Sequence, residues 1–145
     1  LARNTTNHTA KIHLLRGRGE SLPFFDQAFE TVISFLVLCS VGNLSEVLAE
    51  AYRVLKPGGQ LLCFEHVRSL EPSVARWQER LTPLWKKIGC GCHLNRATAK
   101  EIEKTGFVFQ ELQRYRSHRM GLPITAEVIE CVARKPLSGK ADQKM

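Results

Sequence analysis

Two ionisable residues, Glu65 and His66, follow an apolar run that begins after Gln60. A carboxylate and an imidazole at the end of a strand can orient a nucleophile or accept its proton, so both are candidate catalytic groups. The structural alternative is that Glu65 pairs with a nearby arginine and that His66 hydrogen-bonds to a loop. The residues alone leave both interpretations open.

A second group, Cys90-Gly91-Cys92-His93, puts two thiols and an imidazole in one short segment. These residues cannot easily complete a tetrahedral site by themselves. The sequence offers no second pair of ligands, so we expect no bound metal. Cys92 and His93 are better candidates for lining a substrate pocket, and simple packing of the loop is the alternative.

The elements that would position these groups follow from the hydrophobic pattern. Thr31–Cys39 is nearly continuous in apolar residues, which predicts a strand buried on both faces. Asn43, with Glu46 three positions later, predicts a capped helix that ends at a left-handed Gly58. The strand Gln60–Val67 would complete a right-handed βαβ unit of a parallel α/β sheet.

Shorter elements are predicted towards both ends of the chain. Lys11–Leu15 leans apolar and precedes glycines, which indicates a strand and its exit loop. Asn95 is a candidate cap for a helix over about Arg96–Lys104. Phe107–Tyr115 and Glu127–Ala133 alternate like strands and predict an antiparallel pair at the edge of the sheet.

A longer helix is predicted over Pro72–Ile88, and Pro83 should break or kink it. Trp77 and Trp85 share its apolar face, which would suit an apolar substrate, while packing in the core is the alternative. Basic residues elsewhere on this helix leave a peripheral membrane contact as a further option.

Composition limits the class of protein. The 145 residues suffice for one ordinary domain, placed at residues 1–136, and the polar, basic tail Leu137–Met145 is expected to be disordered. The net charge of +7 is spread along the chain without an RNA-binding pattern, so no nucleic-acid partner is expected. Five cysteines, three of them in apolar runs, argue against a disulfide framework and favour the reducing cytoplasm.

Four segments carry a family resemblance, in the order GRGESLPF, FETVISFLVLCSV, AYRVLKPGGQLLCFEHV and GCHLNRATAKEIEKTGF. Together they resemble the class I S-adenosylmethionine-dependent methyltransferases, in the small-molecule branch that includes quinone-biosynthesis enzymes. The resemblance covers about Lys11 to Phe107. LVLCSV, EHV and GC-x-L-x-R are similar to proteins that methylate alkyl thiols. The resemblance implies the second half of a Rossmann-like methyltransferase sheet, S-adenosylmethionine as cofactor, and a small apolar thiol, phenol or quinol as acceptor.

The resemblance also implies where the methyl donor and the acceptor would bind. The positions that it assigns to the donor are Arg18, Gly19, Glu20, Ser34, Phe35 and Leu36. Arg18 departs from the acidic residue that is common there, and it could stack on the adenine but could not accept its amino hydrogens. Phe35 offers an apolar face to the methionine part, and a plain core position is the alternative. In the family, the helix carrying Trp77 and Trp85 lies over the substrate site.

The family's glycine-rich donor loop and the acid that holds the ribose would precede Lys11, and neither is in the sequence. We therefore expect the C-terminal part of a methyltransferase, which by itself binds the donor weakly or not at all. Open strand edges would encourage homodimers. One alternative is a non-catalytic remnant or partner subunit with the same fold. A nucleotide-binding oxidoreductase is a second, which the RVLKPGG segment disfavours.

Overall fold

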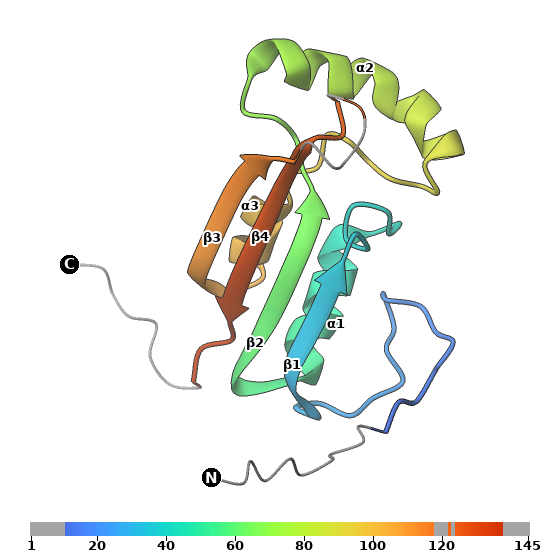
Figure 1. Cartoon of the computed structure of the whole chain (residues 1–145). Coiled ribbons are helices and arrows are strands. Elements are labelled where there is room, and N and C mark those ends of the chain that lie inside the picture. Colours follow the sequence, from blue (N-terminus) through green and yellow to red (C-terminus); the bar gives the residue numbers. More distant parts are fainter. Residues whose placement is uncertain (1–10, 118–121, 123, 138–145) are drawn as a thin grey trace, which may run out of the picture.

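The computed structural model describes residues 11–117, 122 and 124–137. In this part of the chain, one four-stranded sheet has the strand order β1-β2-β4-β3. Its elements in chain order are β1 (Phe29–Phe35), α1 (Leu44–Val54), β2 (Leu55–His66), α2 (Pro72–Ile88), α3 (Thr98–Lys104), β3 (Val108–Arg116) and β4 (Glu127–Arg134). Figure 1 shows α1 and α3 on one face of the sheet and α2 beyond the carboxyl ends of β1 and β2.

The βαβ unit and the antiparallel strand pair are confirmed. β1 runs parallel to β2, whereas β4 is antiparallel to both β2 and β3. The α1 helix begins as predicted, because the Asn43 side chain accepts a hydrogen bond from the Glu46 N–H at 3.4 Å. Val47, Leu48 and Ala51 lie on its buried face. Burying this face, at about 25 cal/mol per Å² of apolar surface, holds α1 against the sheet.

The first predicted strands need correction. Lys11–Leu15 is not a strand, and its residues are exposed. Thr31–Cys39 is a strand only as far as Phe35. Leu36 takes a left-handed φ of 56°, so the chain turns there and residues 37–39 form a loop. The strand is also not buried on both faces: Ile33 is 72% exposed, because none of the described helices covers that side of β1.

Two predicted helix ends are also wrong. α1 ends at Val54, since Leu55 is already extended and opens β2. Gly58, with φ 78°, instead occupies an irregular stretch of β2 where the register to β1 shifts. Asn95 does not cap α3, whose first residue is Thr98.

The α2 helix has the predicted bounds but no break. It continues through Pro83, whose ring removes one helical hydrogen bond. The neighbouring Thr82 hydroxyl donates to the Gln78 carbonyl at 2.6 Å and so pairs a backbone group one turn earlier. Among the described residues, no helix is long and apolar enough to cross a bilayer.

The core lies between the sheet and the helices α1 and α3. Its buried apolar residues include Leu48, Leu55, Leu61, Ile102, Phe107, Ile129 and Ala133. Cys63 and Cys131, paired across β2 and β4, are joined in a disulfide, so the expectation that the cysteines are unpaired is wrong for these two. Of the predicted disordered tail Leu137–Met145, all but Leu137 lies outside the described residues.

Candidate functional site

The Glu65 carboxylate is fully buried and organises the loop that follows β1. Its Oε1 atom accepts hydrogen bonds from the Ser34 hydroxyl at 2.6 Å and from the N–H groups of Val37 and Leu38 at 3.0 Å. Its Oε2 atom accepts from the Cys39 N–H at 3.1 Å. A carboxylate with four donors in the interior fixes the backbone around it. The structure therefore gives Glu65 a positioning role. Among the described residues it forms no ion pair with an arginine, although its charge acts on Arg96.

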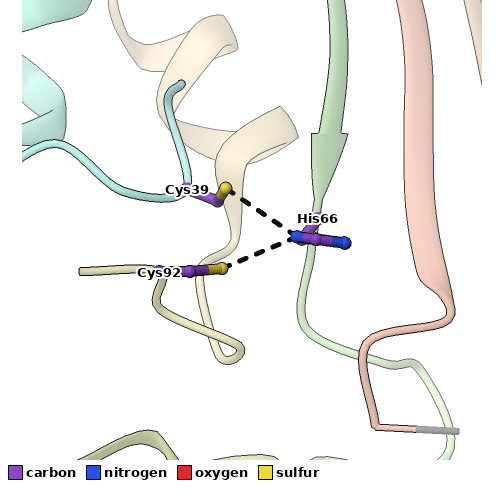
Figure 2. Close-up of side chains that lie close together, drawn as sticks. All are labelled: Cys39, His66 and Cys92. Carbon is purple, nitrogen blue, oxygen red and sulfur yellow. Dashed lines mark hydrogen bonds between the residues drawn. The ribbon is translucent and has the colours of Figure 1, made fainter. Parts of the chain in front are cut away.

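His66, the next residue, points into a different environment. Its Nδ1 atom lies 3.9 Å from Cys39 Sγ and 3.6 Å from Cys92 Sγ, as Figure 2 shows. Its Nε2 atom is buried and has no hydrogen-bond partner among the described residues. The three side chains come from the end of β2, the loop after β1 and the loop after α2. We call Cys39, His66 and Cys92 the sulfur–imidazole cluster.

Hydrogen bonds join the loop after α2 to the loop after β1. The backbone N–H of His93 donates to the Cys39 carbonyl at 2.8 Å, and its ring Nδ1 lies 3.2 Å from the same oxygen. The Arg96 guanidinium donates to the carbonyls of Leu38 and Val41. Cys90 is exposed, so the CGCH segment does not gather its own residues into a site. Instead, it places Cys92 beside His66, which lies 26 positions away in the sequence.

The two cluster thiols titrate in opposite directions. The pKa of Cys92 is lowered to about 7, mainly by a hydrogen bond from Cys39 and further by one from the Trp85 side chain, against the effect of burial. The pKa of Cys39 is raised, by its hydrogen bond to Cys92 and by burial. Near neutral pH the pair therefore holds Cys39 as the thiol and Cys92 as the group that readily ionises.

The two tryptophans of α2 do not share one environment. Trp85 packs beside Cys39, Cys92 and Leu94, and it requires glycine beneath it, since a Cβ on Gly89 would lie 2.6 Å from the indole nitrogen. Trp77 is 55% exposed, and the Arg80 guanidinium lies 5.9 Å from its ring centre. Of the predicted substrate residues, the structure brings together Trp85, Cys92 and His93 and leaves Trp77 outside.

Comparison with known proteins identifies the fold and the proteins that this chain is similar to. A family model described as "Methyltransferase domain" matches residues 1–63. The rat thiol S-methyltransferase TMT1B is 49% identical over 89 residues, which are 61% of this chain and 36% of that protein. A SAM-dependent methyltransferase from Methanosarcina mazei matches the fold with a TM-score of 0.64 at 22% identity, over 83% of this chain and 66% of that one.

Over the matched residues, the chain is similar to class I S-adenosylmethionine-dependent methyltransferases. It also resembles the mouse mitochondrial 2-methoxy-6-polyprenyl-1,4-benzoquinol methylase, with 38% identity over 69 residues, 48% of this chain and 21% of that protein. The chain spans only 36% to 43% of the length of the thiol S-methyltransferases it matches. The family's methyl donor is S-adenosylmethionine, and the sheet is the Rossmann-like methyltransferase sheet that the sequence predicts.

The segment predicted to meet the adenine adjoins the loop after β1. The Glu20 carboxylate accepts a hydrogen bond from the Asn43 N–H at 3.4 Å and lies 3.7 Å from the Arg18 guanidinium. Gly19 packs on α1, where an added Cβ would lie 3.2 Å from the Val47 side chain. The Arg18 side chain is 81% exposed and is therefore free to reach a planar ligand.

The three residues predicted to face the methionine part of the donor, Ser34, Phe35 and Leu36, lie in different environments. The Ser34 hydroxyl is committed to Glu65, whereas Phe35 is exposed and stacks on Phe64 with ring centres 5.0 Å apart. Leu36 donates its N–H to the Phe64 carbonyl. Phe35 and Phe64 line an open groove of about 360 Å³ on the uncovered sheet face, which does not include the sulfur–imidazole cluster. The described residues thus fit an apolar and a stacking contact to part of the donor.

Sequence reasoning missed Cys39 and Arg96 as parts of the site. Both lie in the segments that resemble thiol methyltransferases, LVLCSV and GC-x-L-x-R. A signal for Cys39 was available, because it follows a strand parallel to the one that ends in His66. The carboxyl ends of neighbouring parallel strands lie at one edge of a sheet. The three-residue turn that brings Cys39 towards His66 could not be foreseen.

Proposed function

We propose that this methyltransferase chain takes part in transfer of a methyl group from S-adenosylmethionine to the sulfur of a small, apolar thiol. The observation that carries the proposal is the sulfur–imidazole cluster at the carboxyl ends of β1 and β2, where ligands of such sheets bind. The likeness to curated thiol S-methyltransferases supports it. All three cluster residues lie in the segments that carry this likeness.

The reaction is an in-line displacement in which the acceptor attacks as a thiolate. S-adenosylmethionine supplies an electrophilic methyl group, so positioning and loss of the thiol proton are what the chain must provide. His66 is the described group that promotes this proton loss. Glu65 positions the loop that carries Cys39, and Trp85 provides an apolar wall for the acceptor. Arg18 and Phe35 contact the adenine and methionine parts of the donor.

A transfer assay tests the proposal. The protein is incubated with S-adenosylmethionine labelled in its methyl group and with an alkyl thiol, a phenol or a quinol of similar size. Label on the thiol sulfur is the expected result, and label only on a phenol or quinol would refute the choice of acceptor. Calorimetry measures donor binding separately. Weak binding by this chain is expected, and no label on any acceptor even at millimolar donor would favour the non-catalytic, methyltransferase-fold alternative.

The same proposal includes a peripheral membrane contact through α2, which would suit an apolar acceptor drawn from the lipid phase. The outer face of this helix exposes large apolar side chains beside basic ones, the arrangement of an interfacial helix. These residues are Trp77, Leu84 and Ile88, with Arg76, Arg80, Lys86 and Lys87. Co-sedimentation with anionic vesicles should fall when Trp77 and Ile88 are both changed to serine. It should stay unchanged in Leu112→Ser on β3, and equal binding by all three would refute the contact.

We also propose self-association through the uncovered face of β1. Ile33 is 72% exposed there, and β1 is an edge strand of the described sheet. Analytical ultracentrifugation should show dimers that Ile33→Lys dissociates. Val108→Lys, at an exposed position on the opposite edge strand, serves as the matched control. A monomer at all concentrations would refute this interface.

A further inference from the structure

The sulfur–imidazole cluster has the dimensions of an unfilled metal site. Cys39 Sγ, His66 Nδ1 and Cys92 Sγ all lie within 4.8 Å of one another, and the two sulfur–nitrogen distances are 3.6 and 3.9 Å. Around a tetrahedral zinc ion, with Zn–S near 2.3 Å and Zn–N near 2.0 Å, such ligand atoms are about 3.5 to 3.8 Å apart. Side-chain movements of about 1 Å or less would close the cluster around an ion.

We propose that Cys39, His66 and Cys92 bind a thiophilic divalent cation, with Zn²⁺ as the best match, and leave its fourth position open to the thiolate of the acceptor. Two thiolates and one imidazole are among the ligand sets of catalytic zinc, whose remaining position holds water or substrate. Metal binding stands on the cluster geometry alone. The role of the open position rests on the proposed thiol methyltransferase function.

The backbone on both sides of Cys39 is fixed before any ion arrives. Glu65 accepts its N–H, and His93 donates to its carbonyl through both the backbone and the ring. The sulfur of Cys92 receives a hydrogen bond from the Trp85 side chain, which is the kind of outer contact that stabilises a thiolate ligand. A site preorganised in this way loses little side-chain entropy when it binds a cation.

Charge also favours a divalent ion here. Two thiolates neutralise Zn²⁺ within the cluster, whereas two thiolates without a cation would repel each other in a buried position. Binding of the cation should therefore release protons, because both sulfurs must be thiolates to act as ligands.

The open coordination position of the ion allows the acceptor thiol to lose its proton and become the reactive thiolate. As the thiol sulfur replaces water on the ion, the thiol proton passes to the solvent and the sulfur stays bound as a thiolate. The ion lies at the carboxyl ends of β1 and β2, where the family binds its donor. His66 thus promotes proton loss by holding the cation, and its role is that of a ligand rather than of a free base.

Metal content tests the site without any methyl transfer. The full chain is prepared under reducing conditions, loaded with Zn²⁺, freed of excess metal and analysed by mass spectrometry for zinc. About one zinc ion per chain is expected. Cys92→Ser should lower the affinity at least about tenfold. Cys90→Ser is the matched control, because it removes an exposed thiol from the same loop and should bind zinc as the wild-type chain does.

Cobalt gives a second measurement on the unaltered protein, which does not depend on how the variants fold. Co²⁺ should produce thiolate-to-metal absorption and the intense bands of a tetrahedral ion, and an added alkyl thiol should shift them. Circular dichroism establishes that each variant is folded. Absence of zinc and of cobalt bands, equal affinity in Cys92→Ser, or a Cys39–Cys92 disulfide in the reduced preparation would each overturn the metal site.

The response of the cobalt bands to an added thiol tests this inference separately from the proposed function. Cobalt bands that form but do not respond to any thiol would overturn the open position and leave the metal site standing. A zinc-loaded protein that binds thiols but transfers no methyl group would refute the proposed function only. Full thiol methylation by a zinc-free protein would overturn the role of the metal in the reaction.

Discussion

Glu65 and His66 are adjacent in sequence and both contact Cys39, yet their surroundings otherwise differ. The Glu65 carboxylate lies on the side of α1 and α3 and accepts four hydrogen bonds. His66 lies on the other side of the strand, beside two sulfur atoms, with its Nε2 unpartnered among the described residues. Alternation along a strand produces this division, because successive side chains point to opposite faces of the sheet.

The comparison separates a residue that holds the fold from one that is available for chemistry. A buried carboxylate that accepts four hydrogen bonds is part of the structure, because its removal would leave four donors without an acceptor. A buried polar atom without a partner needs another explanation, such as a catalytic role or a bound ligand. The following predictions test this division, beginning with the largest expected effect.

Glu65→Ala should cause the largest loss of stability. It leaves the Ser34 hydroxyl and three backbone N–H groups unpaired in the interior, each at a cost of about 1 to 3 kcal/mol. We expect the free energy of unfolding, measured with urea, to fall by at least about 3 kcal/mol. Glu46→Ala, at an exposed position of α1, is the control. A loss below about 1 kcal/mol in Glu65→Ala would contradict the positioning role.

His66→Ala should have the opposite profile. Its stability should change by less than about 1.5 kcal/mol, because Nε2 has no partner among the described residues and Nδ1 makes only long contacts to sulfur, at 3.6 and 3.9 Å. Thiol methylation should fall by about 100-fold, whether the imidazole acts directly or through an ion. His13→Ala, at an exposed position, should alter neither quantity. A His66 variant that unfolds as readily as Glu65→Ala would remove the distinction between the two residues.

Cys39→Ala should shift the titration of Cys92. The hydrogen bond from Cys39 is the largest cause that lowers the Cys92 pKa to about 7, so its loss should move this pKa back towards the ordinary 9.0. Ultraviolet absorption of the thiolate as a function of pH measures the shift, with Cys92→Ser as the blank. An unchanged titration in Cys39→Ala would show that the two sulfurs are not coupled.

Glu50 provides a carboxylate near the surface for comparison with Glu65, and the smallest effect. Hydrogen bonds from Arg53 and from the Leu22 N–H lower its pKa to about 2. Because the folded pKa is depressed, this stabilisation is present above the ordinary pKa of 4.5 and is lost as the pH falls towards 2. In Glu50→Gln, stability at neutral pH should fall by about 1 kcal/mol and depend less on pH over that range. A pH dependence equal to that of the wild-type chain would contradict this assignment.

Local signals predicted the elements better than they predicted the site. The Asn43 cap and the bounds of α2 could be read from the sequence because their causes lie within one turn of helix. The end of β1 could not, because Leu36 adopts a left-handed conformation that its side chain does not favour. The partners of His66 lie 27 and 26 positions away, in two different loops, and only the packed structure brings them together.

The Cys63–Cys131 disulfide constrains the part of the chain that carries His66 and Cys92. It joins β2 to β4 across 68 residues, so α2, α3, β3 and the loop that carries Cys92 all belong to one covalently closed ring. Closing a ring of this length restricts the unfolded chain by about 4 kcal/mol. Because the disulfide lies within the sheet, it holds β2 and β4 in register beside the cluster without using any of the cluster's sulfur atoms.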